Sequence, residues 1–173
     1  MRLFIAINFS QASKEKLVRI QQHIKKVALA GNFSRIENLH LTLAFLGEID
    51  SRQLHIIKGA MDSITMPEFE INIKGIGSFS NRKGKIVWAG IEHSAKLYSL
   101  QKELALTLNN SGILLEDRPY KPHLTLGREV RFGEVKPTDF SPFSFTVSSI
   151  DLMLSEVASG VLTYKLLYKK ELA

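Results

Sequence analysis

The chain has 173 residues, of which 45% are hydrophobic and 23% charged, a balance typical of a single soluble globular domain. It contains no cysteine, which excludes disulfides, thiolate metal sites and a cysteine nucleophile. The net charge of +6, from 23 basic and 17 acidic residues, favours an anionic partner, although many proteins carry such a charge without one.

The sequence predicts neither a membrane segment nor a secretion signal. No apolar stretch approaches the roughly 20 residues of a membrane helix. The apolar run at residues 2–8 is too short for a signal peptide and lacks a small-residue cleavage site, so we interpret it as a strand. Because proteins of a reducing compartment rarely use disulfides and this chain has no cysteine, we expect a cytoplasmic protein.

Hydrophobic spacing in the N-terminal half predicts strands alternating with helices. Ser10 can cap a first helix, which carries apolar residues at helical spacing and ends near Gly31. A strand then covers residues 38–47, and Asp50 or Ser51 can cap a second helix. The apolar positions that define these helices are Leu17, Ile20, Ile24 and Val27 in the first and Leu54, Ile57, Met61 and Ile64 in the second.

The C-terminal half is predicted to contain mostly strands. Residues 68–79 alternate polar and apolar side chains, and a turn separates them from a strand at residues 85–92. A third helix ends at Gly112, and the last two strands, residues 143–157 and 161–172, form an antiparallel pair. The remaining features are the helix positions Leu97, Leu100, Leu104 and Leu108 and a strand at residues 122–128.

Strands and helices that mix without strict alternation predict an α+β fold with mostly antiparallel sheet. No linker or low-complexity stretch divides the chain, so we expect residues 1–173 to form one domain of two similar lobes with outer helices. The sequence His-Leu-Thr-Leu occurs twice, at His40 and at His123, each time on a predicted strand that follows a helix. We expect each lobe to supply one of these two motif strands, with a cleft between them.

The two motifs combine residues that suit phosphate chemistry. Side chains alternate along a strand, so His40 shares one face with Thr42, and His123 shares one face with Thr125. One neutral and one protonated imidazole form an acid–base pair near neutral pH, and threonine hydroxyls can donate to phosphoryl oxygens. Arg128 adds a guanidinium whose fork geometry matches phosphate. Such a site needs neither a metal nor a covalent nucleophile.

Simpler explanations compete with this interpretation. A tetrapeptide rich in leucine can recur by chance, and a single strand histidine is more often structural than catalytic. The remaining histidines, His23, His55 and His93, favour surface or structural roles. No cluster offers the third ligand of a zinc site, so we expect no metal and no cofactor. Trp88 favours the core over a stacking role, whereas Phe45 either packs in the core or stacks on a base.

The sequences around the motifs, ENLHLTLAFLGE and RPYKPHLTLGR, closely resemble the paired H-x-T-x signatures of the 2H phosphoesterase superfamily. The match is best with its bacterial and archaeal branch, the RNA 2′,3′-cyclic phosphodiesterases once named 2′-5′ RNA ligases. The resemblance implies a bilobal fold with a pseudo-two-fold axis and hydrolysis of a ribose 2′,3′-cyclic phosphate to a 2′-phosphate. The implied substrates are RNA ends or small cyclic nucleotides, and we expect a monomer by default.

By matching motif positions, the resemblance implies that His40 protonates the leaving O3′ and that His123 activates water. Thr42, Thr125 and Arg128 would hold the phosphoryl oxygens. The residues alone do not decide which histidine is the acid. Two other functions use the same residues: joining of RNA ends, with a 5′-hydroxyl in place of water, and non-catalytic binding of RNA ends. Binding alone requires no proton donor and acceptor, which argues for an enzyme.

Overall fold

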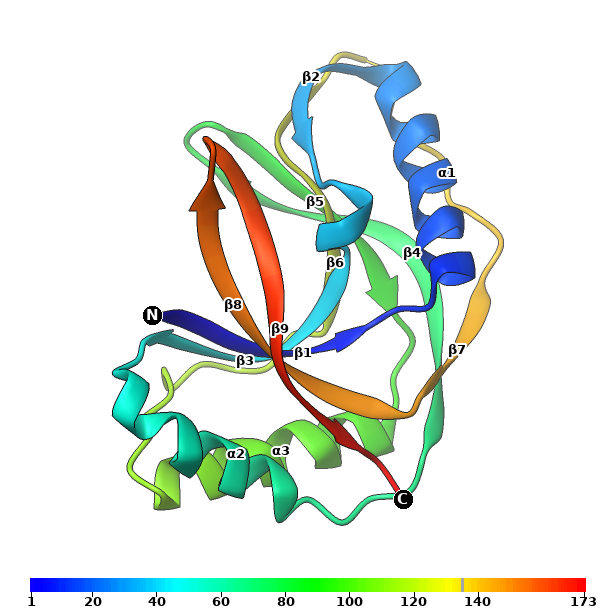
Figure 1. The fold of residues 1–173 in the computed structure, drawn as a ribbon. Coiled ribbons are helices and arrows are strands. Elements are labelled where there is room, and N and C mark those ends of the chain that lie inside the picture. Colours follow the sequence, from blue (N-terminus) through cyan, green and yellow to red (C-terminus); the bar gives the residue numbers. More distant parts are fainter. Residues whose placement is uncertain (135) are drawn as a thin grey trace.

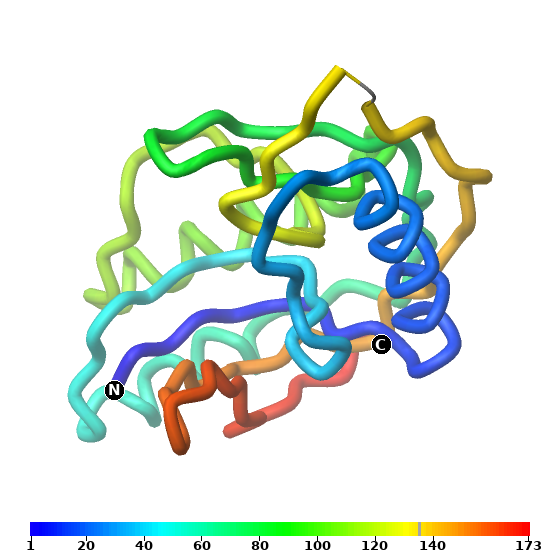
Figure 2. The backbone as a smooth tube through the Cα atoms, turned by 90° about the horizontal axis from the view of Figure 1, so that it is seen from above, coloured from blue at the N-terminus to red at the C-terminus, as the bar shows by residue number. Residues whose placement is uncertain are grey.

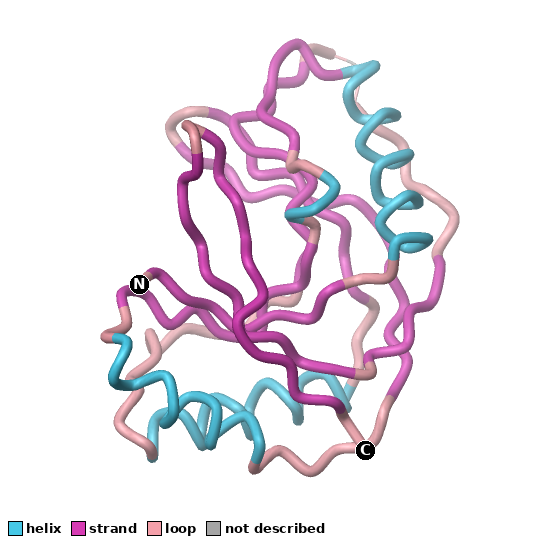
Figure 3. The backbone as a smooth tube through the Cα atoms, in the orientation of Figure 1, coloured by secondary structure: helices cyan, strands magenta, loops and turns pink. Residues whose placement is uncertain are grey.

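The computed structural model describes residues 1–134 and 136–173, and its strands form two antiparallel sheets (Figures 1 and 3). The four-stranded sheet has the order β3-β1-β8-β9, and the five-stranded sheet has the order β2-β6-β5-β4-β7. The strands are β1 (Arg2–Asn8), β2 (Ala28–Phe33), β3 (His40–Glu48), β4 (Phe69–Asn81), β5 (Gly84–Ile91), β6 (His123–Phe132), β7 (Phe143–Val147), β8 (Ser149–Ala158) and β9 (Val161–Glu171).

The helices divide between the two sheets. One helix lies against β2 and β6, and the other two lie side by side near β3 and β9 (Figure 1). Seen from above, the β4–β5 hairpin and the β8–β9 hairpin lie at opposite edges of the molecule (Figure 2). The helices are α1 (Gln11–Val27), α2 (Leu54–Asp62) and α3 (Ala95–Asn110), with short 3₁₀ turns at Ile36–Asn38 and Ser51–Gln53.

The expected α+β class with mostly antiparallel sheet is confirmed, and the two motif strands belong to different sheets. β3 is an edge strand of the four-stranded sheet, and β6 lies inside the five-stranded sheet, between β2 and β5. No helix among the described residues is long and apolar enough to cross a membrane.

The predicted end of the first helix at Gly31 is wrong. α1 ends at Val27, and residues 28–33 form β2, which pairs with β6. A Cβ atom at Gly31 would lie 3.0 Å from Val130 Cγ2 and 3.2 Å from Val130 Cα. The glycine therefore allows close approach of two strands, and hydrophobic spacing along one segment does not distinguish this role from that of a helix terminator.

Residues 143–157, predicted as one strand, form two strands in different sheets. β7 pairs with β4, whereas β8 pairs with β1 and β9, so the chain changes sheets at Ser148. β7 alternates in exposure along its length, while β8 has a continuous buried run from Ile150 to Met153. The predicted antiparallel pairing of this region with residues 161–172 is confirmed, because β8 and β9 form a hairpin.

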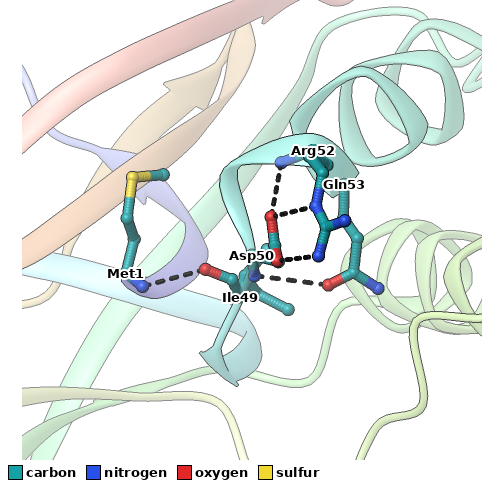
Figure 4. A network of polar contacts seen from close by, with 5 residues as sticks. All are labelled: Met1, Ile49, Asp50, Arg52 and Gln53. Carbon is teal, nitrogen blue, oxygen red and sulfur yellow. Dashed lines mark hydrogen bonds and ion pairs between the residues drawn. The ribbon is translucent and has the colours of Figure 1, made fainter.

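α2 follows a 3₁₀ turn that is capped by Asp50, one of the two predicted caps (Figure 4). The Asp50 carboxylate accepts the Arg52 backbone N–H at 2.9 Å, and the Asp50 N–H donates to Gln53 Oε1 at 3.3 Å, which completes a capping box. The Arg52 side chain also donates to Asp50 and lowers the pKa of its carboxyl group. The amino group of Met1 donates to the Ile49 carbonyl at 2.8 Å and ties β1 to the end of β3.

β1 separates the main core from the surface that carries the first motif. Alternate side chains from Leu3 to Ile7 enter the main core together with residues of both sheets and all three helices. Phe4 points to the opposite face of the four-stranded sheet, where it packs with Met153 and Tyr164. This second face therefore combines an apolar floor with the side chains of His40 and Thr42.

Candidate active site

The first motif places His40 at the start of β3 with its ring held at both nitrogens. Leu41 and Leu43 are buried, so the alternation of the strand turns His40 and Thr42 away from the main core. His40 Nδ1 lies 2.7 Å from the Asn38 carbonyl oxygen, and His40 Nε2 lies 3.0 Å from Thr42 Oγ1. Because a carbonyl oxygen only accepts, Nδ1 carries a hydrogen, and Nε2 is the nitrogen that can exchange a proton.

The second motif repeats this arrangement in the other sheet. His123 begins β6, and its Nδ1 lies 2.7 Å from the carbonyl oxygen of Lys121. Leu124 and Leu126 are buried, as the corresponding leucines are in the first motif. In both motifs a carbonyl two residues before the histidine therefore fixes which ring nitrogen is protonated and leaves Nε2 for chemistry.

Aromatic residues of the four-stranded sheet surround His40. The ring centroid of Phe4 lies 4.9 Å from that of His40, and Tyr164 meets the imidazole edge to face at 5.2 Å. Phe4 and Tyr164 also contact each other at 4.9 Å. These contacts restrict the imidazole to one orientation and exclude water from one side of it.

Aromatic residues of the five-stranded sheet surround His123 in the same way. Phe79 meets the imidazole edge to face at 5.1 Å, and the ring of Trp88 lies 6.3 Å away. The expectation that Trp88 belongs to the core is wrong: the residue is partly exposed and its ring covers Gly77 on the side of the sheet that carries His123. A Cβ at Gly77 would lie 2.0 Å from the indole, so only glycine accommodates this ring.

The environment of His40 disfavours its charged form. Burial lowers the pKa of His40 to about 4, although the hydrogen bond to the Asn38 carbonyl opposes the shift. The nearby charge of Lys14 acts in the same direction as burial, and Arg128 and His123 add to it. In the free protein at neutral pH the His40 ring is therefore neutral, and a bound anion would raise its pKa.

A cavity of about 640 Å³, which we call the first hollow, is lined by all five candidate side chains that the sequence analysis identified. Its wall also contains Phe4, Tyr164, Ser34 and Asn38. Arg128 is exposed at its rim, where its guanidinium can reach an anion bound between the histidines. The five are His40, Thr42, His123, Thr125 and Arg128.

The other histidines lie elsewhere. His23 Nε2 lies 2.9 Å from Thr138 Oγ1, His55 is exposed, and His93 stacks on Tyr98 at 5.3 Å. None of the three lines the first hollow. Within residues 1–134 and 136–173, no group of three His, Asp or Glu side chains is arranged as a metal site would require.

Two side-chain hydrogen bonds fix the motif strands, one across the cleft and one within the five-stranded sheet, where Ser34 follows β2 beside β6. The Tyr120 hydroxyl, three residues before His123, donates to the Thr42 carbonyl oxygen at 3.2 Å. Burial raises the pKa of Tyr120, so its phenol stays protonated and can donate. The Ser34 hydroxyl donates to the Thr125 carbonyl oxygen at 3.0 Å. Each motif strand is thus held by the segment that leads into the other motif.

Sequence reasoning did not identify Phe4, Tyr164, Phe79, Tyr120 or Ser34 as parts of the site. Strand alternation gives only the face on which the strand residues Phe4, Phe79 and Tyr164 lie, and Ser34 and Tyr120 lie outside the strands. Which strand lies beside which depends on pairings between distant segments, and one sequence contains no signal for them. Phe45, whose position the sequence left open, is exposed and has the Arg2 guanidinium 5.1 Å from its ring centroid.

The chain is similar in sequence and in fold to known phosphoesterases. The LigT like Phosphoesterase family matches residues 7–88. The RNA 2′,3′-cyclic phosphodiesterase of Archaeoglobus fulgidus is 31% identical over 157 residues, covering 81% of this chain and 88% of that protein. The enzyme of the same name from Thermotoga maritima is 28% identical over 180 residues, covering 98% and 94%. The crystal structure of Escherichia coli LigT complexed with 3′-AMP superposes with a TM-score of 0.87 at 28% identity, covering 99% of this chain and 97% of that one.

Proposed function

The chain belongs to the LigT-like phosphoesterases of the 2H superfamily, and on that premise we propose that it hydrolyses the terminal 2′,3′-cyclic phosphate of RNA to a 2′-phosphate. One observation carries the proposal. Two histidines from different sheets line the first hollow, and the Nδ1–H of each donates a hydrogen bond to a backbone carbonyl. Both Nε2 atoms are therefore available for proton transfer to and from a substrate.

The proposed reaction adds water to phosphorus and breaks the P–O3′ bond. His123 Nε2 accepts a proton from the attacking water, and His40 Nε2 gives a proton to the leaving O3′. Because the pKa of His40 in the free protein is about 4, His40 acquires its proton when the anionic substrate binds beside it. Thr42, Thr125 and Arg128 hold the non-bridging oxygens as negative charge develops on them.

The proposal extends to the organisation of the chain. A single copy contains both histidines, which supports residues 1–173 acting as one bilobal domain and as a monomer. The absence of cysteine supports a cytoplasmic location. The substrates are RNA ends or small nucleotides that carry a 2′,3′-cyclic phosphate.

Incubation with an RNA oligonucleotide that ends in a 2′,3′-cyclic phosphate tests the activity. We expect a product heavier by one water that carries a 2′-phosphate, and we expect the rate to persist with a strong chelator, because the proposed steps use only side chains. Mass spectrometry identifies the water addition, and comparison with synthetic 2′- and 3′-phosphates identifies the isomer. Loss of the rate on chelation, with recovery on adding a divalent ion, would overturn the two-histidine chemistry.

The same assay separates the two rival functions. Tight binding of the cyclic end without any conversion would indicate a binding module. Addition of an RNA with a free 5′-hydroxyl tests ligation, since a longer product joined through a 2′-5′ bond would then appear in place of the hydrolysed one.

The ionisation of His40 gives a second expected result. Because burial lowers its pKa, the ring should stay neutral as pH falls through 6 and should take up a proton only near pH 4. NMR titration of labelled histidine in the free protein measures this midpoint. On the cyclic substrate, kcat/KM should fall on the acid side near the same pH and fall again at high pH, where both rings are neutral. A His40 midpoint near that of a free imidazole would contradict the conclusion that burial keeps this ring neutral in the free protein.

A further inference from the structure

The cleft does not end at the histidines. A second hollow of about 440 Å³ adjoins the first, bounded by β3, the β4–β5 hairpin, α3 and the loop before β6. It shares Thr42, Phe45, His123 and Arg128 with the first hollow. The proposed reaction centre therefore lies at the junction of two hollows, and a ligand held there can extend into both.

The two volumes exceed what one nucleotide needs. Binding sites for small molecules usually enclose about 300–1,000 Å³, so either hollow alone can contain a nucleoside. A mononucleotide with its cyclic phosphate at the junction would fill one hollow and leave the other open. On the basis of the proposed function, we propose that the second hollow is a subsite for the nucleotide that precedes the cyclic end, so that the substrate is an RNA strand of at least two nucleotides.

The charges of the second hollow support this occupant. Arg118 and Lys121 line its wall but not that of the first hollow, and both are exposed. Arg118 Nε lies 3.3 Å from Glu116, while among the described residues Lys121 has no ion-pair partner. A terminal nucleoside is neutral beyond its cyclic phosphate, whereas the preceding nucleotide brings a phosphodiester anion. Cations that line the second hollow and not the first match that second phosphate.

The remaining wall suits a base and differs from that of the first hollow. Phe79, Ile86 and Leu115 are partly buried and provide an apolar surface on which a base can lie without sequence preference. The first hollow instead offers the side chains of Asn38 and Ser34 beside its aromatic residues, which suit the hydrogen-bonding groups of a terminal nucleoside. The RNA strand therefore extends from the reaction centre into the second hollow.

Comparison of a nucleoside 2′,3′-cyclic phosphate with a trinucleotide bearing the same cyclic end tests the subsite. For the unaltered protein we expect kcat/KM to be about tenfold or more higher on the trinucleotide, and its salt dependence to be steeper by about 0.7 per additional phosphate contact. Arg118→Gln should lower kcat/KM on the trinucleotide by about threefold to tenfold, mostly through KM, and flatten its salt dependence. On the mononucleotide the variant should stay within about twofold of the unaltered protein.

Arg35→Gln is the matched control, because Arg35 lines the first hollow, is exposed and pairs with Glu37 at 3.4 Å much as Arg118 pairs with Glu116. Equal losses on both substrates in Arg118→Gln would show that the second hollow holds the terminal nucleoside and would overturn the proposal. A loss confined to the trinucleotide in Arg35→Gln but absent in Arg118→Gln would overturn it as well. Equal kcat/KM of the unaltered protein on both substrates would remove the subsite and leave the proposed activity intact, whereas no turnover of either would refute that activity.

Discussion

His40→Ala and His123→Ala should each lower kcat on a 2′,3′-cyclic phosphate by about 10²- to 10⁴-fold, the range expected for loss of a general acid or base. The Nδ1–H of each ring donates to a backbone carbonyl, so Nε2 is the one nitrogen that can exchange a proton with the substrate. Each variant removes this nitrogen. Steady-state kinetics on a cyclic-ended oligonucleotide measures both losses. His23→Ala is the control, because this histidine lies outside the hollow and contacts Thr138.

The double variant tests whether the two histidines act together. If acid and base serve the same transition state, removing the second group after the first costs little more, and the combined loss should fall far short of the product of the single losses. Circular dichroism and thermal unfolding establish that each variant is folded. Near-normal turnover by either folded single variant would show that its histidine has another role.

Arg128→Lys should lower kcat/KM by about 10- to 100-fold although the charge is retained, because lysine lacks the planar fork that contacts two phosphoryl oxygens at once. Arg128 is exposed at the rim of both hollows, so the substitution should not disturb the core. Arg131→Lys is the matched control on the same strand, since Arg131 is exposed and does not line either hollow. Equal activity of the two lysine variants would show that Arg128 contributes only its charge.

Substitution of Thr125, which lies on the same strand as Arg128, tests whether catalysis needs the hydroxyl group or only the shape of this side chain. Thr125→Val keeps the β-branched side chain and the carbonyl that accepts from Ser34, and it removes only the hydroxyl. Loss of one donor to the developing charge should lower kcat by about tenfold or more. Wild-type kinetics would assign Thr125 a structural role and restrict the phosphate contacts to the remaining groups.

The features that were predictable from the sequence depend on local periodicity. The α+β class and the cap at Asp50 follow from spacing within short segments. The paired motifs were visible because the same four residues occur twice, and strand alternation then placed His40 and Thr42 on one face. These inferences needed no knowledge of which strands are neighbours.

The features that were not predictable depend on contacts between distant segments. Gly31 was predicted to end the first helix. Its role in the close approach to Val130 follows only from the pairing of β2 with β6, which a single segment of sequence does not reveal. Residues 143–157 read as one strand because only two adjacent serines, Ser148 and Ser149, interrupt the alternation of polar and apolar side chains where the chain changes sheets. Tyr164 reaches His40 only because β9 joins the sheet through β8.

Two side-chain hydrogen bonds join the halves of the chain at the motif strands. Tyr120 precedes the second motif yet fixes the backbone of the first, and Ser34 precedes the first motif yet fixes the backbone of the second. Each motif strand also pairs with a strand of its own half, β3 with β1 and β6 with β5, so these two bonds add to backbone pairing that is already present. A substitution at Tyr120 or Ser34 therefore removes a support from the motif strand that belongs to the other half of the chain.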